Sequence, residues 1–113
     1  NLYVFQQVPQ LHLLSYCDLM ITSGGMNSIA ECIEKEVPML VCPLSLKSDQ
    51  LGNSARVVYH GLGLRARIKL DSSRTIEKRI VQLFENYATF KRNLSMMRTK
   101  ILAESTAINT EVI

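Results

Sequence analysis

The sequence predicts an α/β fold in which helices cover both faces of a parallel β-sheet. Short, continuous apolar runs alternate along the chain with segments that place apolar residues every three or four positions. The runs themselves are not interrupted by polar residues, which is typical of strands buried on both faces. Such strands, alternating with amphipathic helices, favour a parallel sheet. The length of 113 residues suits one domain, so residues 1–113 are interpreted as a single unit.

The candidate strands and helices follow one another in a regular order. Apolar runs at residues 2–8, 19–22, 38–42 and 62–66 are the predicted strands. Residues 10–16, 27–36 and 50–60 are the predicted helices between them, and Gly61 ends the third. A further helix is capped by Ser73 or Thr75 and carries Phe84 on its core face, and residues 89–103 repeat the helical pattern. No pattern is recognisable after Glu104.

Composition and charge exclude several classes of protein. Hydrophobic residues make up 47% and charged residues 20% of the chain, which is typical of a globular domain rather than a disordered one. The net charge of +3 comes from dispersed basic residues, so no nucleic-acid partner is expected and only a weak contribution to membrane-surface docking stays open. The apolar runs are shorter than the roughly 20 residues of a membrane span, and no secretory signal is visible.

The cysteines and histidines indicate neither a disulfide framework nor a metal site. Cys17, Cys32 and Cys42 are odd in number and lie in apolar contexts, so we expect all three to be buried free thiols. Unpaired thiols favour a reducing, cytoplasmic location. His12 and His60 have no acidic or cysteine neighbour at ligand spacing, so neither a metal nor a cofactor is expected.

The segment from Thr22 to Ser28 is the first candidate for ligand binding, because it follows a predicted strand and begins a helix. Two glycines in it, Gly24 and Gly25, allow the backbone to approach a ligand closely. The unpaired N–H groups of a helix start attract phosphate, and Ser23, Asn27 and Ser28 can add hydrogen bonds. The alternative is an ordinary turn in which Asn27 or Ser28 caps the helix.

Acidic and amide side chains near these loops can bind the hydroxyl groups of a ligand. Glu31 shares a helix face with Asn27 and Ser28, and its carboxylate suits ribose hydroxyls, although an acid favoured by the helix dipole is the simpler alternative. The second candidate loop runs from Pro43 to Gln50. In it, Asp49 is either a helix cap or, with Gln50, a pair that binds vicinal sugar hydroxyls. Asn53 lies one turn further along that helix.

Several motifs occur in an order that resembles the donor-binding signature of the UDP-glycosyltransferases, in particular the bacterial, macrolide-type branch. The match covers residues 1–70, and the helical tail fits more loosely. Many elements in one order are more specific than a single glycine-rich loop. The matching residues are Pro9, Gln10, Gly24, Gly25, Met26, Asn27, Ser28, Glu31, Val37, Pro38, Pro43, Asp49, Gln50, Asn53 and Ala55.

The resemblance implies the C-terminal half of a GT-B fold, a Rossmann-like domain that binds a UDP-sugar or another nucleoside-diphosphate sugar. The general base of the family, usually a histidine, belongs to an N-terminal acceptor domain that we expect to be absent from residues 1–113. The chain then has no catalytic residue of its own and is inactive alone. The implied contacts are Val8 and Gln10 at the base, Ser23, Gly24, Gly25, Asn27 and Ser28 at the diphosphate, Glu31 at the ribose, and Asp49 and Gln50 at the sugar.

The chain departs from the family pattern at three places. Ser23 stands where the family usually has a histidine that contacts the donor phosphate, so one charge-assisted hydrogen bond is missing. Glu36 stands where the family usually has glycine before Val-Pro, and a left-handed backbone there would strain it by about 1 kcal/mol or more. The loop before Asp49 is slightly longer than in many members, which makes the sugar contacts less secure than the phosphate contacts.

Three functional hypotheses follow. In the first, the complete enzyme transfers a hexosyl group from a nucleotide sugar to a hydroxyl of a small acceptor molecule bound by the N-terminal domain. In the second, the chain is a non-catalytic module that binds nucleotide sugars and docks on a separate acceptor-domain chain or forms a homo-oligomer. A sugar-nucleotide epimerase of similar architecture is the third, and Asp49, Gln50 and Asn53 favour the transferases over it.

Overall fold

The computed structural model describes residues 10–45 and 49–112, with side chains as far as residue 105. Within these ranges, β1 (Met20–Thr22), β2 (Met39–Val41) and β3 (Gly63–Arg65) form one parallel sheet in that order. Met20 pairs with Met39, which pairs with Gly63 on its other side. The predicted parallel sheet is confirmed for these strands. The predicted strand 2–8, and Val8 with it, lies outside the described residues.

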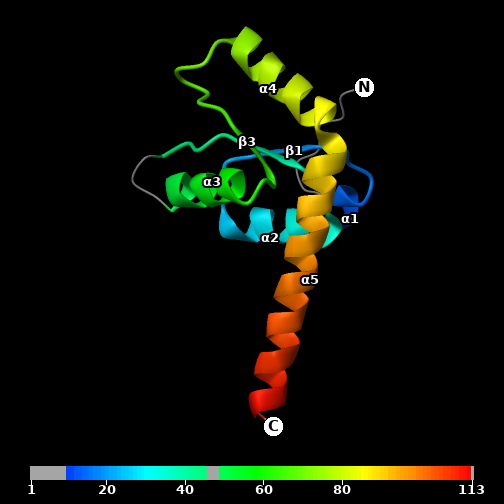
Figure 1. Ribbon diagram of the computed structural model, residues 1–113. Coiled ribbons are helices and arrows are strands. Elements are labelled where there is room, and N and C mark those ends of the chain that lie inside the picture. Colours follow the sequence, from blue (N-terminus) through cyan, green and yellow to red (C-terminus); the bar gives the residue numbers. More distant parts are fainter. Residues whose placement is uncertain (1–9, 46–48, 113) are drawn as a thin grey trace.

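Helices follow the strands, as Figure 1 shows. α1 (Gln10–Leu14) precedes β1, α2 (Met26–Lys35) and α3 (Gln50–Tyr59) connect the strands, and α4 (Ser73–Glu85) follows β3. α5 (Tyr87–Val112) crosses the domain and projects far beyond it (Figure 1). α5 continues past Glu104, although the sequence shows no pattern there. The pattern is missing because residues 98–105 are all exposed and no apolar stripe marks the helix.

The core is divided into two layers by the central strand. The side chains of Met39 and Val41 are fully buried on one face of β2, in a cluster with residues of α1, α2, α3 and α5. The side chain of Leu40 is fully buried on the other face, together with Leu83 of α4. Because successive side chains of a strand point to opposite faces, this division shows that helices cover both faces of the sheet, as predicted. The first cluster consists of Leu14, Ile29, Cys32, Val37, Met39, Val41, Val57, Leu62 and Leu94.

Three local predictions are wrong. Cys17 is exposed because it lies in the turn after α1, where its thiol donates to the carbonyl of Leu13 at 3.3 Å; Cys32 and Cys42 are buried as expected. α4 is capped by Ser72, whose hydroxyl accepts from the amide of Thr75 at 3.2 Å, and not by Ser73 or Thr75. Phe84 is 50% exposed because it stacks on Tyr87 at the start of α5 rather than entering the core.

α2 and α3 end in the same backbone motif but with different residues. After α2, the amides of Glu36 and Val37 donate to the carbonyls of Ile33 and Cys32, and Glu36 has left-handed φ and ψ of 55° and 48°. After α3, Gly61 occupies the position that Glu36 has after α2, and its φ is 67°. This Schellman arrangement ordinarily has glycine at the left-handed position. The strain expected at Glu36 is therefore present.

α5 closes the edge of the sheet at which the strands begin. The hydroxyl of Tyr87 donates to the carbonyl of Asp18 at 2.8 Å, and burial together with the Asp18 carboxylate raises the pKa of Tyr87, which keeps the phenol protonated. Lys91 Nζ donates to the carbonyl of Glu36 at 2.6 Å, and Asn93 donates to the carbonyl of Gly61 at 3.0 Å. Three loops that precede the three strands are thereby attached to one helix. None of the described helices is both long enough and apolar enough to cross a membrane.

Candidate functional site

The fold requires glycine at Gly24, in the loop after β1. Its φ is +93°, it is buried, and a Cβ at this position would lie 2.9 Å from Cγ1 of Val41 and 3.3 Å from the carbonyl oxygen of Gln50. Its amide donates to Thr22 Oγ1 at 3.3 Å, and its carbonyl accepts from the side chain of Asn53 at 3.0 Å. Only glycine fits this backbone and this contact without strain. Gly24 therefore joins the two predicted ligand loops.

Gly25 has no comparable structural reason to be glycine. Its φ of −66° and ψ of 145° suit any residue, and an added Cβ would meet no atom within 4 Å. It occupies the N-cap position of α2, where no side chain of the described residues makes a capping bond. Asn27 and Ser28 lie inside the first turn, so the alternative in which one of them caps the helix is wrong. The first amides of α2 therefore have no side-chain cap.

Gln10, Ser28 and Glu31 form one hydrogen-bonded group beside this helix start. The amide nitrogen of Gln10 donates to Ser28 Oγ at 3.2 Å and to Glu31 Oε2 at 2.9 Å. Three residues that the sequence assigns to the base, the phosphate and the ribose are thus brought together by α1 and α2. Gln10 contacts the residue expected at the ribose, so its amide orients that carboxylate. Ser23 lies half-buried and Asn27 exposed in the same loop and helix start.

The second loop positions the residues expected to bind the sugar. Asp49 stands at the N-cap position of α3, yet its exposed side chain makes no capping hydrogen bond. The side-chain carbonyl of Gln50 accepts from the amide of Leu44 at 3.0 Å and thereby holds the loop. Asn53 is 4% exposed and is engaged with Gly24, so its place is in the loop contact rather than at a ligand.

The ionisable groups near the helix start do not include a reactive thiol. Burial raises the pKa of Cys32 to about 12, and the nearby charges of Glu31 and Cys17 act in the same direction. Burial, and then Asp71, raises the pKa of Cys42. Both thiols stay protonated at neutral pH and are poor nucleophiles. Over the residues that the structure describes, no group of three histidine, cysteine, aspartate or glutamate side chains is placed to hold a metal.

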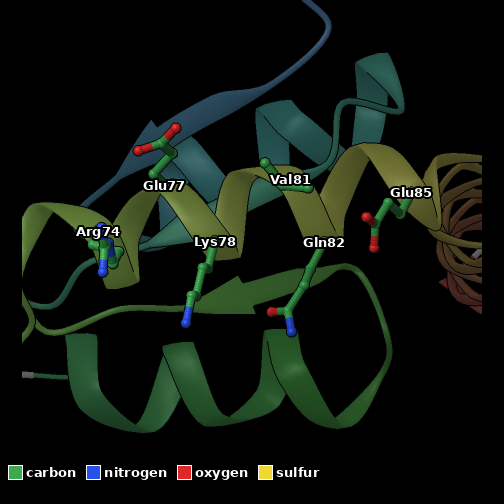
Figure 2. Close-up of a pocket in the computed structure, with 6 residues that line it drawn as sticks. All are labelled: Arg74, Glu77, Lys78, Val81, Gln82 and Glu85. Atoms are coloured by element: carbon green, nitrogen blue, oxygen red, sulfur yellow. The ribbon is translucent and has the colours of Figure 1, made fainter.

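Hollows also lie outside the residues assigned to the donor. A depression of about 570 Å³ follows α4, and Figure 2 shows its lining side chains along that helix. Its charges are mixed, since Arg74 and Lys78 are balanced by Glu77 and Glu85, so it attracts neither cations nor anions strongly. A groove of about 770 Å³ after β2 and β3 has basic and apolar walls. Its basic residues belong to the charges that are dispersed along the sequence.

The comparison with protein families decides the family of the chain. The family model described as "UDP-glucoronosyl and UDP-glucosyl transferase" matches residues 1–104. The chain belongs to this family. The resemblance found in the sequence is thereby confirmed, over a longer stretch than the 70 residues on which it rested.

Several glycosyltransferases resemble the chain in sequence or in structure. Zeaxanthin glucosyltransferase from Pantoea ananas is 34% identical over 101 residues, which are 88% of this chain and 22% of that protein. The solved glycotransferase of kitacinnamycin is 33% identical with a TM-score of 0.81, and the match covers 89% of this chain and 26% of that one. Spinosyn forosaminyltransferase SpnP, at 20% identity and a TM-score of 0.83 over 90% and 27% of the chains, shows likeness in fold alone.

These likenesses confirm the expected Rossmann-like α/β class, as it occurs in GT-B glycosyltransferases. The chain spans about a quarter of the length of the relatives it matches. The family resemblance therefore applies to one part of such an enzyme.

Proposed function

We propose that this chain is the nucleotide-sugar donor-binding domain of a glycosyltransferase that transfers a hexosyl group from a UDP-sugar to an acceptor hydroxyl. Family membership over residues 1–104 supports the class of reaction. The acceptor site and the general base belong, in this proposal, to a part of the enzyme other than residues 1–113. Three unpaired cysteines support a reducing, cytoplasmic location.

The observation that carries the proposal is the contrast between Gly24 and Gly25. The fold requires glycine at Gly24 but not at Gly25, where a Cβ would project into open space at the uncapped start of α2. A diphosphate that approached the amides of this helix start would occupy that space, and a side chain there would exclude it. Close approach of backbone to a ligand is one of the recurring reasons for a glycine.

The same helix start accounts for the chemical contribution of the domain. When the acceptor hydroxyl attacks the anomeric carbon, the bond to the diphosphate breaks and negative charge grows on the leaving group. Oriented N–H groups and the helix dipole of α2 stabilise that charge without a metal ion. Glu31, oriented by Gln10, binds the ribose hydroxyls, and the exposed carboxylate of Asp49 binds the sugar hydroxyls beside Gln50.

Ser23 sets the strength of phosphate binding in this proposal. It is half-buried in the loop before Gly24 and supplies a neutral hydroxyl where the family usually has histidine. Replacing it by histidine adds a side chain that can donate from a charged ring. We expect Ser23→His to raise the affinity for UDP by about tenfold at pH 6 and by less at pH 8.

Isothermal titration of the chain with UDP and UDP-glucose tests the proposal. Gly25→Ala should lower the affinity for both by at least about tenfold, because a methyl group fills the phosphate position. Gly52→Ala is the matched control, since its Cβ also meets nothing within 4 Å but lies on the exposed side of α3. Asp49→Asn should lower the affinity for UDP-glucose and leave the affinity for UDP unchanged. If no nucleoside diphosphate or its sugar conjugate binds the wild-type chain, the proposal is wrong.

A further inference from the structure

Three arginines converge beyond the carboxyl end of β3. Arg65 ends β3, Arg67 follows two residues later, and Arg79 reaches the same place from α4. Together with Leu70 and Asp71 they line a cavity of about 280 Å³. The formal charges on its wall sum to an excess of positive charge, because Asp71 is the single carboxylate among these lining residues.

The positive charge in this cavity is not neutralised within the described part of the chain. Asp71 Oδ2 accepts from the backbone amide of Arg67 at 2.7 Å, which engages the carboxylate with the loop. One terminal nitrogen of Arg79 donates to Gln82 Oε1 at 3.1 Å, and its Nε–H is buried without any hydrogen-bond partner among the described residues. Buried donors without a partner are rare in folded proteins, so the guanidinium of Arg79 is only partly satisfied by the described residues.

An apolar groove continues from the same wall. The groove of about 770 Å³ shares Arg65, Arg67 and Leu70 with the arginine cavity. Its other walls include Leu44 and Ile68, which are 63% and 52% exposed, while Leu70 is 75% exposed. Exposed apolar side chains gathered in one hollow beside cations indicate a binding surface more often than an ordinary protein surface.

We propose that the cavity and the groove together bind an anionic amphiphile, with a phosphate head between the three arginines and an apolar chain along the groove. Guanidinium groups donate paired, parallel hydrogen bonds that match the oxygens of a phosphate, and three of them line this cavity. The groove suits the apolar chain because it begins at the arginines and is lined by leucine and isoleucine side chains. We expect this site to bind independently of UDP, since it contains none of the residues assigned to the diphosphate or the ribose. It does adjoin the sugar residues, because the amide of Leu44 donates to the side chain of Gln50.

Titration of the full chain with inorganic phosphate, monododecyl phosphate below its micellar concentration, and uncharged dodecyl maltoside tests both halves of the site. Monododecyl phosphate should bind at least about tenfold more tightly than inorganic phosphate, and dodecyl maltoside should bind weakly or not at all. The affinity for both phosphates should fall as the salt concentration rises. Saturating UDP should leave the affinity for monododecyl phosphate unchanged.

Matched variants separate the head site from the groove. Arg79→Gln should lower the affinity for both phosphates by about tenfold or more. Arg74→Gln lies on the same helix but outside the cavity, and it should change neither affinity. Ile68→Gln should lower the affinity for monododecyl phosphate but not the affinity for inorganic phosphate. Ile101→Gln, on the exposed part of α5, is the control and should change neither affinity. Arg79→Lys keeps the charge without the planar fork and should bind with intermediate affinity, provided that circular dichroism shows each variant to be folded.

Each contrary result overturns a defined part of the proposal. Equal affinities for the two phosphates would show that the groove does not contribute to binding. Equal affinities for monododecyl phosphate and dodecyl maltoside would show that the arginines do not contribute. Absence of binding by either phosphate would refute the site as a whole, and competition by UDP would refute its independence from the donor site.

Discussion

The two edges of the sheet are built in opposite ways. At the edge where the strands begin, side chains of α5 donate to backbone carbonyls of all three loops that precede the strands. At the edge where the strands end, the loop contacts are made by Gly24, Asn53 and Gln50, while the start of α2 has no capping side chain. The helices begin at the edge where the strands end, so unpaired N–H groups gather there, and they end at the opposite edge, where unpaired carbonyls gather. The two edges therefore need different partners.

This comparison teaches which residues should affect stability and which should affect binding. Backbone groups that a protein satisfies with its own side chains contribute to the free energy of unfolding. Backbone groups that it leaves open at a helix start are available to a ligand. The beginning edge should therefore be sensitive in unfolding experiments and silent in ligand titrations, and the ending edge should behave in the reverse way except at Gly24.

The largest effect on stability is expected at Gly24, the exception on the ligand edge. Gly24→Ala forces a side chain into a backbone with positive φ and into contact with Val41, which should lower the free energy of unfolding by about 2–4 kcal/mol. Urea denaturation followed by circular dichroism measures this loss. A loss below about 0.5 kcal/mol would show that the loop relaxes easily and does not connect the two parts of the site.

The next effect tests the edge closed by α5. Lys91→Met keeps the apolar stem but removes the charged donor from the carbonyl of Glu36, at the end of α2 where a cation is favourable. The free energy of unfolding should fall by about 1–2 kcal/mol, with the UDP affinity unchanged. Lys100→Met, which replaces an exposed lysine of the same helix, should change neither quantity. A weaker affinity for UDP in Lys91→Met would contradict the separation of the two edges.

A smaller effect, confined to binding, is expected at Glu31. Glu31→Gln replaces a carboxylate with a neutral amide and should lower the affinity for UDP by about tenfold, while the free energy of unfolding stays within about 0.5 kcal/mol of the wild type. Glu34→Gln, on the exposed face of α2, is the control. If Glu31 binds the ribose, the wild type should prefer UDP to 2′-deoxy-UDP, and the variant should lose most of that preference. An unchanged preference would place Glu31 elsewhere.

The sequence patterns are sufficient to predict the α/β fold because each strand and helix end is marked by residues that are close in sequence. Met39, Leu40 and Val41 form an unbroken apolar run, and that run is the central strand buried on both faces. Gly61 marks the end of α3 for a local reason as well, since its backbone is left-handed. The end of α5 was missed because its exposed turns carry no periodic pattern.

The candidate site could be predicted only where its residues are close in sequence. Gly24, Gly25 and Glu31 lie in one loop and one helix, so their spacing alone brings them together. The contact of Asn53 with Gly24 depends on two strands being neighbours, and the sequence places Asn53 only one turn beyond Asp49 and Gln50 on the same helix. Arg79 gave no signal at all, because it reaches Arg65 and Arg67 only through the packing of α4 on β3.

The smallest expected effect is a gain in stability at Glu36, and it sharpens the comparison within the closed edge itself. Glu36 and Gly61 occupy equivalent left-handed positions, and the carbonyl of each accepts from α5, yet only Gly61 is free of strain. Glu36→Gly should raise the free energy of unfolding by about 0.5–1 kcal/mol, because relief of the left-handed strain exceeds the added entropy of a glycine in the unfolded chain. Gly61→Ala should do the opposite, since its Cβ would lie 2.5 Å from Nδ2 of Asn93. Urea denaturation of the two variants measures both changes, and UDP affinity should be constant throughout. A loss of stability in Glu36→Gly would mean that the glutamate side chain contributes more at this edge than its backbone conformation takes away.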